Sequence, residues 1–316
     1  MTPLVSVITP CYRQGHFLSH ALDSVLTQSV GDLEMIVVDD GSPDDTSRVA
    51  MRYMARDPRV RYVVQPNRGL AGARNAGLAL ATGAFVVCLD ADDQLLPDAL
   101  RTGMASLEQD PAAVYTRGRF EVIDRDGRLI GHGADTQSAS DDEYELLLRD
   151  NPIWLPAAVM FRRAAFDSIT PFDSRADAAA DLELYLRLAR VHRVTRHAGM
   201  VAQYRRHGHN MSMNPTVMAP AILKVLEAQR QYTERNVRWR AAQRYAIREW
   251  ESRHLIPMMR KAVRDLVHGS PQAMTTGFKL IAGRGPGAVA HALVRRVRSP
   301  RGRATNRELG PASGAA

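Results

Sequence analysis

VCLDADDQLLPD, residues 87–98, is a hydrophobic segment that ends abruptly in three carboxylates, Asp90, Asp92 and Asp93. Aspartates this close repel one another unless a cation or hydrogen-bond donors neutralise them. The carboxyl end of a buried strand is also where α/β proteins place their ligands. The segment therefore predicts a strand that ends at a binding site, where oxygen ligands would suit Mg²⁺ or Mn²⁺.

Two other structures would also place aspartates here. One is a solvated loop in which an aspartate caps a helix before Pro97. The other is a calcium-binding EF-hand, which needs Gly at its sixth position and Glu at its twelfth. Counting from Asp90, the chain has Leu95 and Arg101 at these positions. The EF-hand therefore fits worse, and the helix cap stays open beside the metal site.

Upstream of this segment, short apolar runs alternate with amphipathic helical patterns. Strands are predicted at 4–9, 33–38, 60–65 and 84–89, and helices at 17–28, 46–56 and 69–81. This alternation predicts a parallel sheet covered by helices on both faces. Three of the strands end in polar clusters, at residues 9–10, 39–40 and 90–93. Because parallel strands end along one edge, we expect these clusters to converge on a single crevice.

Downstream, the pattern is less regular. Further strands are predicted at 113–119, 157–163 and 201–205, a hairpin turn at 124–127, a mobile polar loop at 131–142 and a helix at 181–191. From about Val217 the pattern is helical, with a break at Pro257. The sequence contains no internal repeat of fixed period.

The chain has 316 residues, and its charge is unevenly distributed. Residues 1–215 carry 23 Lys and Arg against 28 Asp and Glu, a balance of −5, and residues 216–316 carry 19 against 6, a balance of +13. We therefore expect a main domain at 1–215 and a basic helical C-terminal extension at 216–316. A solvated helical surface is the first expectation for this extension, with peripheral contact to an anionic membrane second, and no base-reading motif suggests nucleic acid.

The sequence also gives expectations about the cellular compartment. Cys11 and Cys88 lie in or beside predicted core strands, which is typical of buried thiols in a reduced cytosolic protein. The first ten residues lack the basic segment of a secretory signal. The most apolar uncharged stretch, 76–89, is shorter than the roughly 20 residues needed to cross a bilayer. We expect a cytoplasmic protein, either free or peripheral on the inner membrane face.

With these elements in place, the chain resembles family 2 glycosyltransferases of the GT-A fold over roughly residues 4–212. The resemblance depends on five spaced elements in order: VSVITPCYRQGHFLSHALDSVLTQ, EMIVVDDGSPDDT, NRGLAGARNAGLALATGAFVVCLDADD, DLELYLRLA and YRRHGHNMS. It implies an α/β fold with a mostly parallel sheet flanked by helices, and an inverting, metal-dependent enzyme. The region after residue 215 would be a helical extension of that fold.

The resemblance assigns the donor site. Thr9, Pro10 and Tyr12 would form the wall against which the base of a nucleotide-sugar rests. Asp39 would accept a hydrogen bond from the base, and an ionised carboxylate suits a uracil or thymine N–H because it only accepts. Arg74 would meet base or phosphate through its planar guanidinium. A surface helix residue is the alternative for Arg74.

The resemblance also assigns the diphosphate site. Asp90 would bind the ribose, and Asp92 would bind the Mg²⁺ or Mn²⁺ that bridges the diphosphate. Asp93 is either a supporting residue or a helix cap. Arg205 and His207 resemble the element that closes over the diphosphate, although a histidine near a strand end can also be structural.

On the acceptor side, Asp181 matches the family's general base. Ala180 stands where the family usually has Glu, and the loss of that carboxylate predicts a lower pKa for Asp181. Asp181 would also cap the helix that follows, and the two roles are compatible. Trp154 matches the part of the family that shapes the acceptor pocket, although a core tryptophan is equally consistent.

The sequence therefore predicts an inverting glycosyltransferase that moves a sugar from a nucleoside-diphosphate donor, a UDP-sugar first, to a hydroxyl of a glycan, lipid-linked or small-molecule acceptor. The change at Ala180 motivates an alternative, a non-catalytic nucleotide-sugar-binding or scaffold protein. A nucleotidyltransferase on a similar sheet fits less well. Such enzymes carry a Gly-rich basic loop after the first strand, and CYRQGHF offers only Arg13 and Gly15.

Overall fold

The computed structural model describes residues 3–133, 141–167 and 169–258. The chain divides into two compact units, Met1–Trp250 and Glu251–Ala316. The first unit thus extends past residue 215, where the charge balance placed the domain boundary. In the described part of the second unit, a short π-helix covers Glu251–Leu255. A search of the described helices finds none with the length and apolar character needed to span a bilayer.

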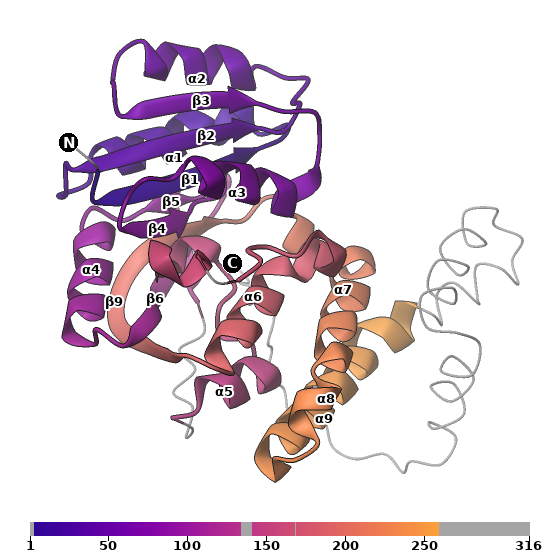
Figure 1. Cartoon of the computed structure of the whole chain (residues 1–316). Coiled ribbons are helices and arrows are strands. Elements are labelled where there is room, and N and C mark those ends of the chain that lie inside the picture. Colours follow the sequence, from indigo (N-terminus) through magenta and orange to yellow (C-terminus); the bar gives the residue numbers. More distant parts are fainter. Residues whose placement is uncertain (1–2, 134–140, 168, 259–316) are drawn as a thin grey trace, which may run out of the picture. The chain divides into compact units, whose positions relative to one another are not determined.

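The first four strands are parallel and form one half of the sheet. They lie in the order β3 (Val60–Val64), β2 (Leu33–Asp39), β1 (Val5–Cys11) and β4 (Phe85–Cys88). Helices α1 (Gly15–Leu26), α2 (Thr46–Met54) and α3 (Gly69–Leu80) connect them. Figure 1 shows this half in indigo and purple. Every strand and helix predicted for residues 4–89 is confirmed, with ends that shift by a few residues.

The other half of the sheet contains antiparallel pairs. Beyond β4, the described strands follow as β8 (Val159–Arg162), β6 (Ala113–Ile123), β9 (Arg193–Arg205) and β5 (Gln94–Leu95). Strand β7 (Leu129–His132) pairs with β6, which confirms the hairpin turn predicted at 124–127. Of the loop predicted at 131–142, residues 134–140 lie outside the described residues. Residues 131–132 belong to β7 instead of the loop.

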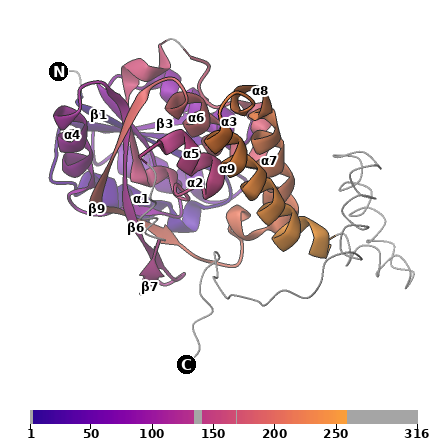
Figure 2. The same ribbon diagram turned by 90° about the horizontal axis from the view of Figure 1, so that it is seen from below.

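Helices cover both faces of the sheet, and alternate residues of each central strand pack into two separate hydrophobic cores, one on each face. Val5 and Val7 of β1 pack with α1, α2 and α4 (Ala99–Gln109), whereas Ile8 packs with the opposite layer. That opposite layer contains α3, α5 (Glu143–Arg149), α6 (Ala180–Ala189), α7 (Pro215–Ala228) and α9 (Val237–Trp250). Figure 2 shows α5, α6, α7 and α9 gathered together, and α8 (Arg230–Thr233) connects the last two. This double coverage is the arrangement predicted from the continuous apolar strands.

At the edge where the parallel strands begin, a buried carboxylate joins several segments. Glu34 of β2 accepts hydrogen bonds from the Ser6 hydroxyl at 2.7 Å, from the amide and hydroxyl of Thr82 at 2.7 Å each, and from Arg61 at 3.0 Å. Burial alone would raise the pKa of Glu34, but these hydrogen bonds lower it below the ordinary value. The beginnings of β1, β2 and β3 are thereby tied to the segment before β4.

Candidate functional site

The predicted donor-side residues meet at the opposite edge of the sheet, where β1, β2 and β4 end. β1 ends at Cys11, β2 at Asp39 and β4 at Cys88, and the DADD turn follows at residues 90–93. Parallel pairing places these three ends side by side. The convergence predicted from the polar clusters is therefore present.

Asp92 is the centre of a hydrogen-bonded cluster. Its Oδ2 atom lies 3.0 Å from Nε2 of His207 and 2.9 Å from Nε2 of Gln14, and the Asn210 amide is 3.5 Å away. Asp92 and His207 are both buried, with side chains 9% and 7% exposed. The structure thus joins two residues that the sequence assigned to the same diphosphate. Gln14 and Asn210 were not predicted, because nothing in a lone amide side chain marks it as a neighbour of a distant aspartate.

Arg205 is directed into the interior of the protein. It is the last residue of β9 and is 1% exposed. Its guanidinium points to backbone carbonyls, including that of Asp92 at 3.0 Å. The expectation that Arg205 closes over the diphosphate is therefore wrong, because the side chain is directed into the protein.

Asp93 lies deeper than Asp92 and is 2% exposed. It accepts a 2.8 Å hydrogen bond from the Arg205 amide. Burial, together with the neighbouring charges of Asp92 and Asp90, raises the pKa of Asp93 well above its usual range. Asp93 is thus a supporting residue of the turn, one of the two roles left open by the sequence.

Arg74 of α3 forms an ion pair with Asp90 of the DADD turn. Its side chain is 3% exposed, and its Nη2 atom donates to both oxygens of Asp90, at 2.8 and 3.1 Å. Burial would lower the pKa of Arg74, but Asp90 and then Asp181 raise it above its ordinary value. The surface-residue alternative for Arg74 is excluded, since its side chain is buried and its guanidinium pairs with Asp90.

Asp181 lies in the first turn of α6, where its Oδ1 atom accepts a 2.8 Å hydrogen bond from the Leu182 amide. Burial raises the pKa of Asp181 above its ordinary value, while Arg74 opposes the change. Sequence reasoning predicted a lower pKa, because Ala180 removes a neighbouring carboxylate. The Ala180 methyl is buried in the core instead, and desolvation of Asp181 raises the pKa in the absence of that carboxylate.

One of the two cysteines lies close to Arg74, Asp90 and Asp181. Cys88, the last residue of β4, is buried, and burial raises its pKa to about 12. Arg74 opposes this change, while Asp90 and Asp181 add to it. Burial likewise raises the pKa of Cys11 to about 12. Both cysteines are free, as the sequence predicted, and neither is a thiolate near neutral pH.

The three residues predicted to form the base wall differ in exposure. Thr9 and Pro10 are buried within β1, whereas Tyr12 is 42% exposed. The guanidinium of Arg13 lies over the Tyr12 ring, 5.3 Å from its centroid. Arg13 also has a left-handed backbone, with φ of 59°. Of the three, only Tyr12 therefore presents an exposed side chain.

Asp39 already accepts two hydrogen bonds. The Ser42 amide donates to Oδ1 and the Tyr62 hydroxyl donates to Oδ2, both at 2.7 Å. A carboxylate has about four acceptor positions, so Asp39 can accept from a further donor. Asp40, beside it, accepts from Gln65 at 2.7 Å and from the Arg68 amide at 2.8 Å.

The donor set around Asp92 fits a divalent cation. Asp92 and His207 offer a carboxylate oxygen and an imidazole nitrogen that share one small volume, and both are common metal ligands in proteins. Over the described ranges of the chain, no three His, Cys, Asp or Glu side chains enclose a site on their own.

The acceptor side is less fully formed. Trp154, in the segment before β8, is 39% exposed, and its ring lies 6.2 Å from that of Phe120. An aromatic surface is therefore available there, and its role as an acceptor contact stays a prediction.

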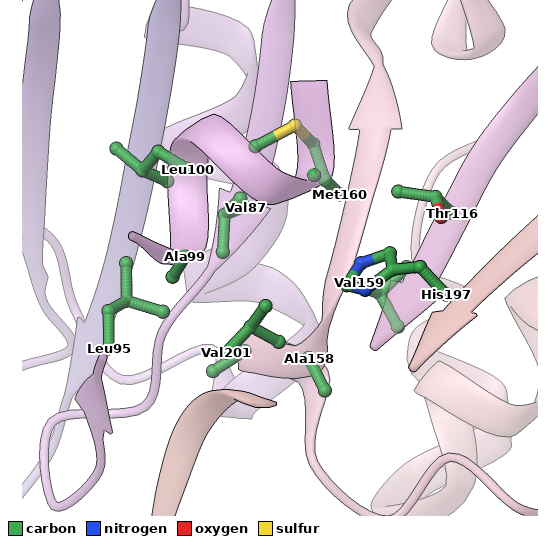
Figure 3. A pocket seen from close by; sticks show the side chains of 12 residues that line it. Val87, Leu95, Ala99, Leu100, Thr116, Ala158, Val159, Met160, His197 and Val201 are labelled. Carbon is green, nitrogen blue, oxygen red and sulfur yellow. The ribbon is translucent and has the colours of Figure 1, made fainter. Parts of the chain in front are cut away.

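A small cavity of about 10 Å³, room for roughly one water molecule, lies away from these residues. Figure 3 shows its lining between α4 and the strands, with His197 beside Thr116 and Val159. Burial and the charge of Arg117 lower the pKa of His197. None of the predicted site residues lines this cavity, so we interpret it as a packing defect under α4.

Comparisons with known structures agree with the fold. S. aureus TarS residues 1–349, crystallised with UDP-GlcNAc, has a TM-score of 0.59 at 16% identity, over 93% of this chain and 82% of that one. The mannosyltransferase PcManGT from Pyrobaculum calidifontis, in complex with GDP-Man and Mn²⁺, has a TM-score of 0.55 at 19% identity, over 94% and 87%. These likenesses confirm the α/β GT-A architecture.

Sequence comparisons identify the family. Escherichia coli chondroitin synthase is 34% identical over 191 residues, 60% of this chain and 27% of that protein. The hyaluronan synthase of Pasteurella multocida is 32% identical over 214 residues, 67% of this chain and 21% of that protein. The chain thus spans about a quarter of the length of these relatives. The family model described as glycosyl transferase family 2 matches residues 6–170, and this chain therefore belongs to glycosyl transferase family 2.

Proposed function

We propose that this glycosyltransferase is an inverting enzyme that moves a sugar from a UDP-sugar to a hydroxyl of a glycan, lipid-linked or small-molecule acceptor. The observation that carries the proposal is the position of Asp181. Its carboxyl lies close enough to the Arg74–Asp90 ion pair for both charges to act on its pKa. The base candidate is therefore electrostatically coupled to the ion pair on the donor side.

Asp181 is the general base in this proposal. It takes the proton from the acceptor hydroxyl, and the oxygen attacks the anomeric carbon on the face opposite the diphosphate. One in-line displacement of this kind inverts the anomeric configuration and forms no covalent sugar–enzyme intermediate. The raised pKa of Asp181 favours this role, because a carboxylate with an ordinary pKa is a weak base near neutral pH.

The donor is held by residues from the ends of three strands. Tyr12, supported by Thr9 and Pro10, faces the base, and Asp39 uses its remaining acceptor capacity for the imide N–H of uracil. Asp90 binds the ribose. Arg74 fixes the Asp90 carboxylate by two hydrogen bonds, so that its own role is to orient the ribose-binding residue and to balance charge.

Asp92 and His207 would hold Mg²⁺ or Mn²⁺ beside the diphosphate. When bound, such an ion stabilises the negative charge that develops on the leaving diphosphate. The protein's own contribution is to bring the two ligands together from distant parts of the chain and to orient them through Gln14 and Asn210. The Mn²⁺ in the complex of PcManGT supports this choice of ion.

The basic C-terminal residues suggest a place of action. We propose peripheral contact with an anionic membrane face on the cytoplasmic side, which would suit a lipid-linked acceptor. The apolar and basic residues that motivated this idea, 278–298, lie outside the described residues. The proposal therefore depends on the charge balance of the sequence alone.

The test of the catalytic proposal is Asp181→Asn, with Asp167→Asn as an exposed control. Asparagine keeps an oxygen that can accept from the Leu182 amide, so the fold should persist. We expect sugar transfer to fall by roughly 10²–10⁴-fold, the usual contribution of a general base, with UDP binding preserved. UDP-sugars and GDP-mannose should both be assayed, with NMR of the anomeric proton as the readout of stereochemistry.

Three outcomes contradict parts of the proposal. Turnover of Asp181→Asn at the wild-type rate would exclude Asp181 as base. A product that keeps the donor's anomeric configuration would exclude inversion. Metal-dependent UDP binding by the wild-type protein, without hydrolysis or transfer in a broad acceptor screen, would favour the alternative of a nucleotide-sugar-binding scaffold, which the Ala180 substitution motivates.

A further inference from the structure

Arg205 is a buried cation whose hydrogen bonds go to the backbone of two turns. At 1% exposed, it is among the largest fully buried side chains. Its Nε atom donates to the carbonyl of Asp92 at 3.0 Å, and its Nη1 atom donates to the carbonyls of Asp124 and Arg125 at 3.3 and 2.9 Å. A buried charge is costly unless its donors are satisfied, so these bonds are a structural requirement. The guanidinium thereby joins the DADD turn to the turn between β6 and β7.

The backbone of Arg205 makes two further contacts with the same cluster. Its amide donates to Oδ1 of Asp93 at 2.8 Å, and its carbonyl accepts from the Asn210 amide at 2.9 Å. Asn210 in turn reaches Oδ2 of Asp92, the atom that also contacts His207. Side chain and backbone of Arg205 therefore both contact residues that surround the Asp92–His207 pair.

An aromatic ring completes the arrangement. The guanidinium carbon of Arg205 lies 5.1 Å from the centroid of the Phe17 ring, and the same ring lies 5.0 Å from that of His207. Phe17 is 5% exposed and belongs to α1. One ring thus supports both the buried cation and the imidazole.

We propose that Arg205 is a positioning residue that sets the geometry between the Asp92 carboxylate and the His207 imidazole without touching the donor. The inference rests on the proposed function, because that function assigns Asp92 and His207 to the cation and diphosphate. Lysine cannot replace Arg205, since its single ammonium cannot reach two turns in the divergent directions of Nε and Nη1. The expected consequence is a weaker metal site with no change in nucleotide contacts.

The chain offers a matched control in Arg162 of β8. Its Nε atom donates to the carbonyl of Ala113 at 3.0 Å and its Nη2 atom to that of Leu107 at 2.6 Å. The guanidinium carbon lies 5.7 Å from the centroid of the Phe85 ring. Arg162 thus has the same chemistry as Arg205, but its partners are not in the Asp92 cluster. Arg162→Lys should lower the stability of the fold, because it also loses guanidinium hydrogen bonds to backbone carbonyls. It should not affect metal binding.

The experiment is a calorimetric titration of UDP binding at a series of Mn²⁺ concentrations, for wild type, Arg205→Lys and Arg162→Lys, with thermal melting alongside. We expect Arg205→Lys to raise the Mn²⁺ concentration for half-maximal UDP binding by about tenfold or more, the order lost when residues supporting a metal ligand are changed. Arg162→Lys should leave that concentration unchanged. If Arg205→Lys does not fold, Phe17→Leu should shift it in the same direction.

The outcomes separate this inference from the proposed function. Equal Mn²⁺ dependence in wild type and Arg205→Lys, or an equal shift in Arg162→Lys, would overturn the positioning role alone. If Phe17→Leu has to be used, an unchanged Mn²⁺ dependence of UDP binding in that variant would also overturn the positioning role. If UDP binding by the wild-type protein does not depend on Mn²⁺ concentration, the metal part of the proposed function is wrong. The positioning role of Arg205 would then be wrong as well.

Discussion

Asp181 and Arg74 are linked by charge although they lie in different elements, α6 and α3. Burial raises the pKa of Asp181, and the guanidinium of Arg74 holds that increase in check. A cation removed from this position would leave the carboxylate more easily protonated. Arg74 therefore couples the charge of Asp181, the proposed base, to that of Asp90.

This coupling predicts the pH profile of Arg74→Met. A general base works only when it is ionised, and loss of the cation raises the pKa of Asp181 further. The acidic limb of kcat should therefore move to higher pH, with activity falling about tenfold per pH unit below the pKa. Measurement of kcat at saturating donor separates this effect from weaker nucleotide binding.

The matched variant is Arg74→Lys, which keeps the charge. It should retain an acidic limb close to that of wild type, even if its KM for the donor rises. A limb that does not move in Arg74→Met, or that moves equally in both variants, would show that Arg74 does not set the protonation of Asp181.

Among individual residues, the sequence predicted the charged residues of the site but not the polar residues that contact them. Asp90, Asp92 and His207 could be predicted because the ordered motifs of the resemblance assign them to one site, and the structure brings Asp92 and His207 together. Gln14 and Asn210 could not, since amides are ordinary in turns and their bonds to Asp92 span 78 and 118 residues of chain. The direction of Arg205 could not be predicted either, because a sequence does not show which side of a strand end is buried.

At the scale of elements, α3 must lie close to the sheet for Arg74 to reach Asp90. Gly77, one turn further along α3, makes this approach possible. A Cβ atom added there would lie 2.3 Å from Cγ2 of Ile8 and 3.2 Å from Cγ2 of Val38, both buried side chains of the sheet. Neither branched side chain can move aside easily, so a larger residue must push the helix away.

Gly77→Ala should therefore destabilise the protein by roughly 1–3 kcal/mol, the usual cost of overpacking a core, and should weaken UDP binding through displacement of Arg74. Gly31→Ala is the control, because a Cβ atom at Gly31 meets nothing within 4 Å. Chemical denaturation gives the free energies of unfolding. Equal stability of the two variants would contradict the close packing of α3.

The elements that sequence reasoning missed are short or polar. Strand β5 has two residues and α5 has seven, too few for a periodic pattern to emerge. Strand β9 begins at Arg193 and not at Val201, because its first half is largely polar and partly exposed. That half pairs with β6 through shifted registers, which no alternation of apolar residues would indicate.

At the scale of the whole molecule, the charge asymmetry predicted a boundary that differs from the compact units. Helices α7 and α9 carry basic residues, yet Ile222, Leu226 and Ala246 pack into the first unit's core. Charge therefore marked the exposed faces of these helices and not the end of the folded unit. Residues 251–316 still hold 12 Lys and Arg against 3 Asp and Glu.

This remaining charge predicts salt-sensitive binding to anionic vesicles. The intact protein should co-sediment with phosphatidylserine-containing vesicles at about 0.01 M salt and be largely released at about 0.15 M, since the screening length falls from about 30 to 8 Å. Vesicles of phosphatidylcholine alone are the control. If the protein stays in solution with anionic vesicles at low salt, the proposal of membrane contact should be dropped.

The two ends of the strands carry different kinds of carboxylate. Asp39, Asp90 and Asp92 lie at one end, while Glu34 at the other joins Ser6, Arg61 and Thr82 far from them. Because Glu34 joins the strands at the second end, a mutagenesis library directed at donor choice can vary exposed residues at the first end without removing those bonds. Glu34 and its three partners should be left unvaried in such a library, and this division gives the fold room to acquire new sugar specificities.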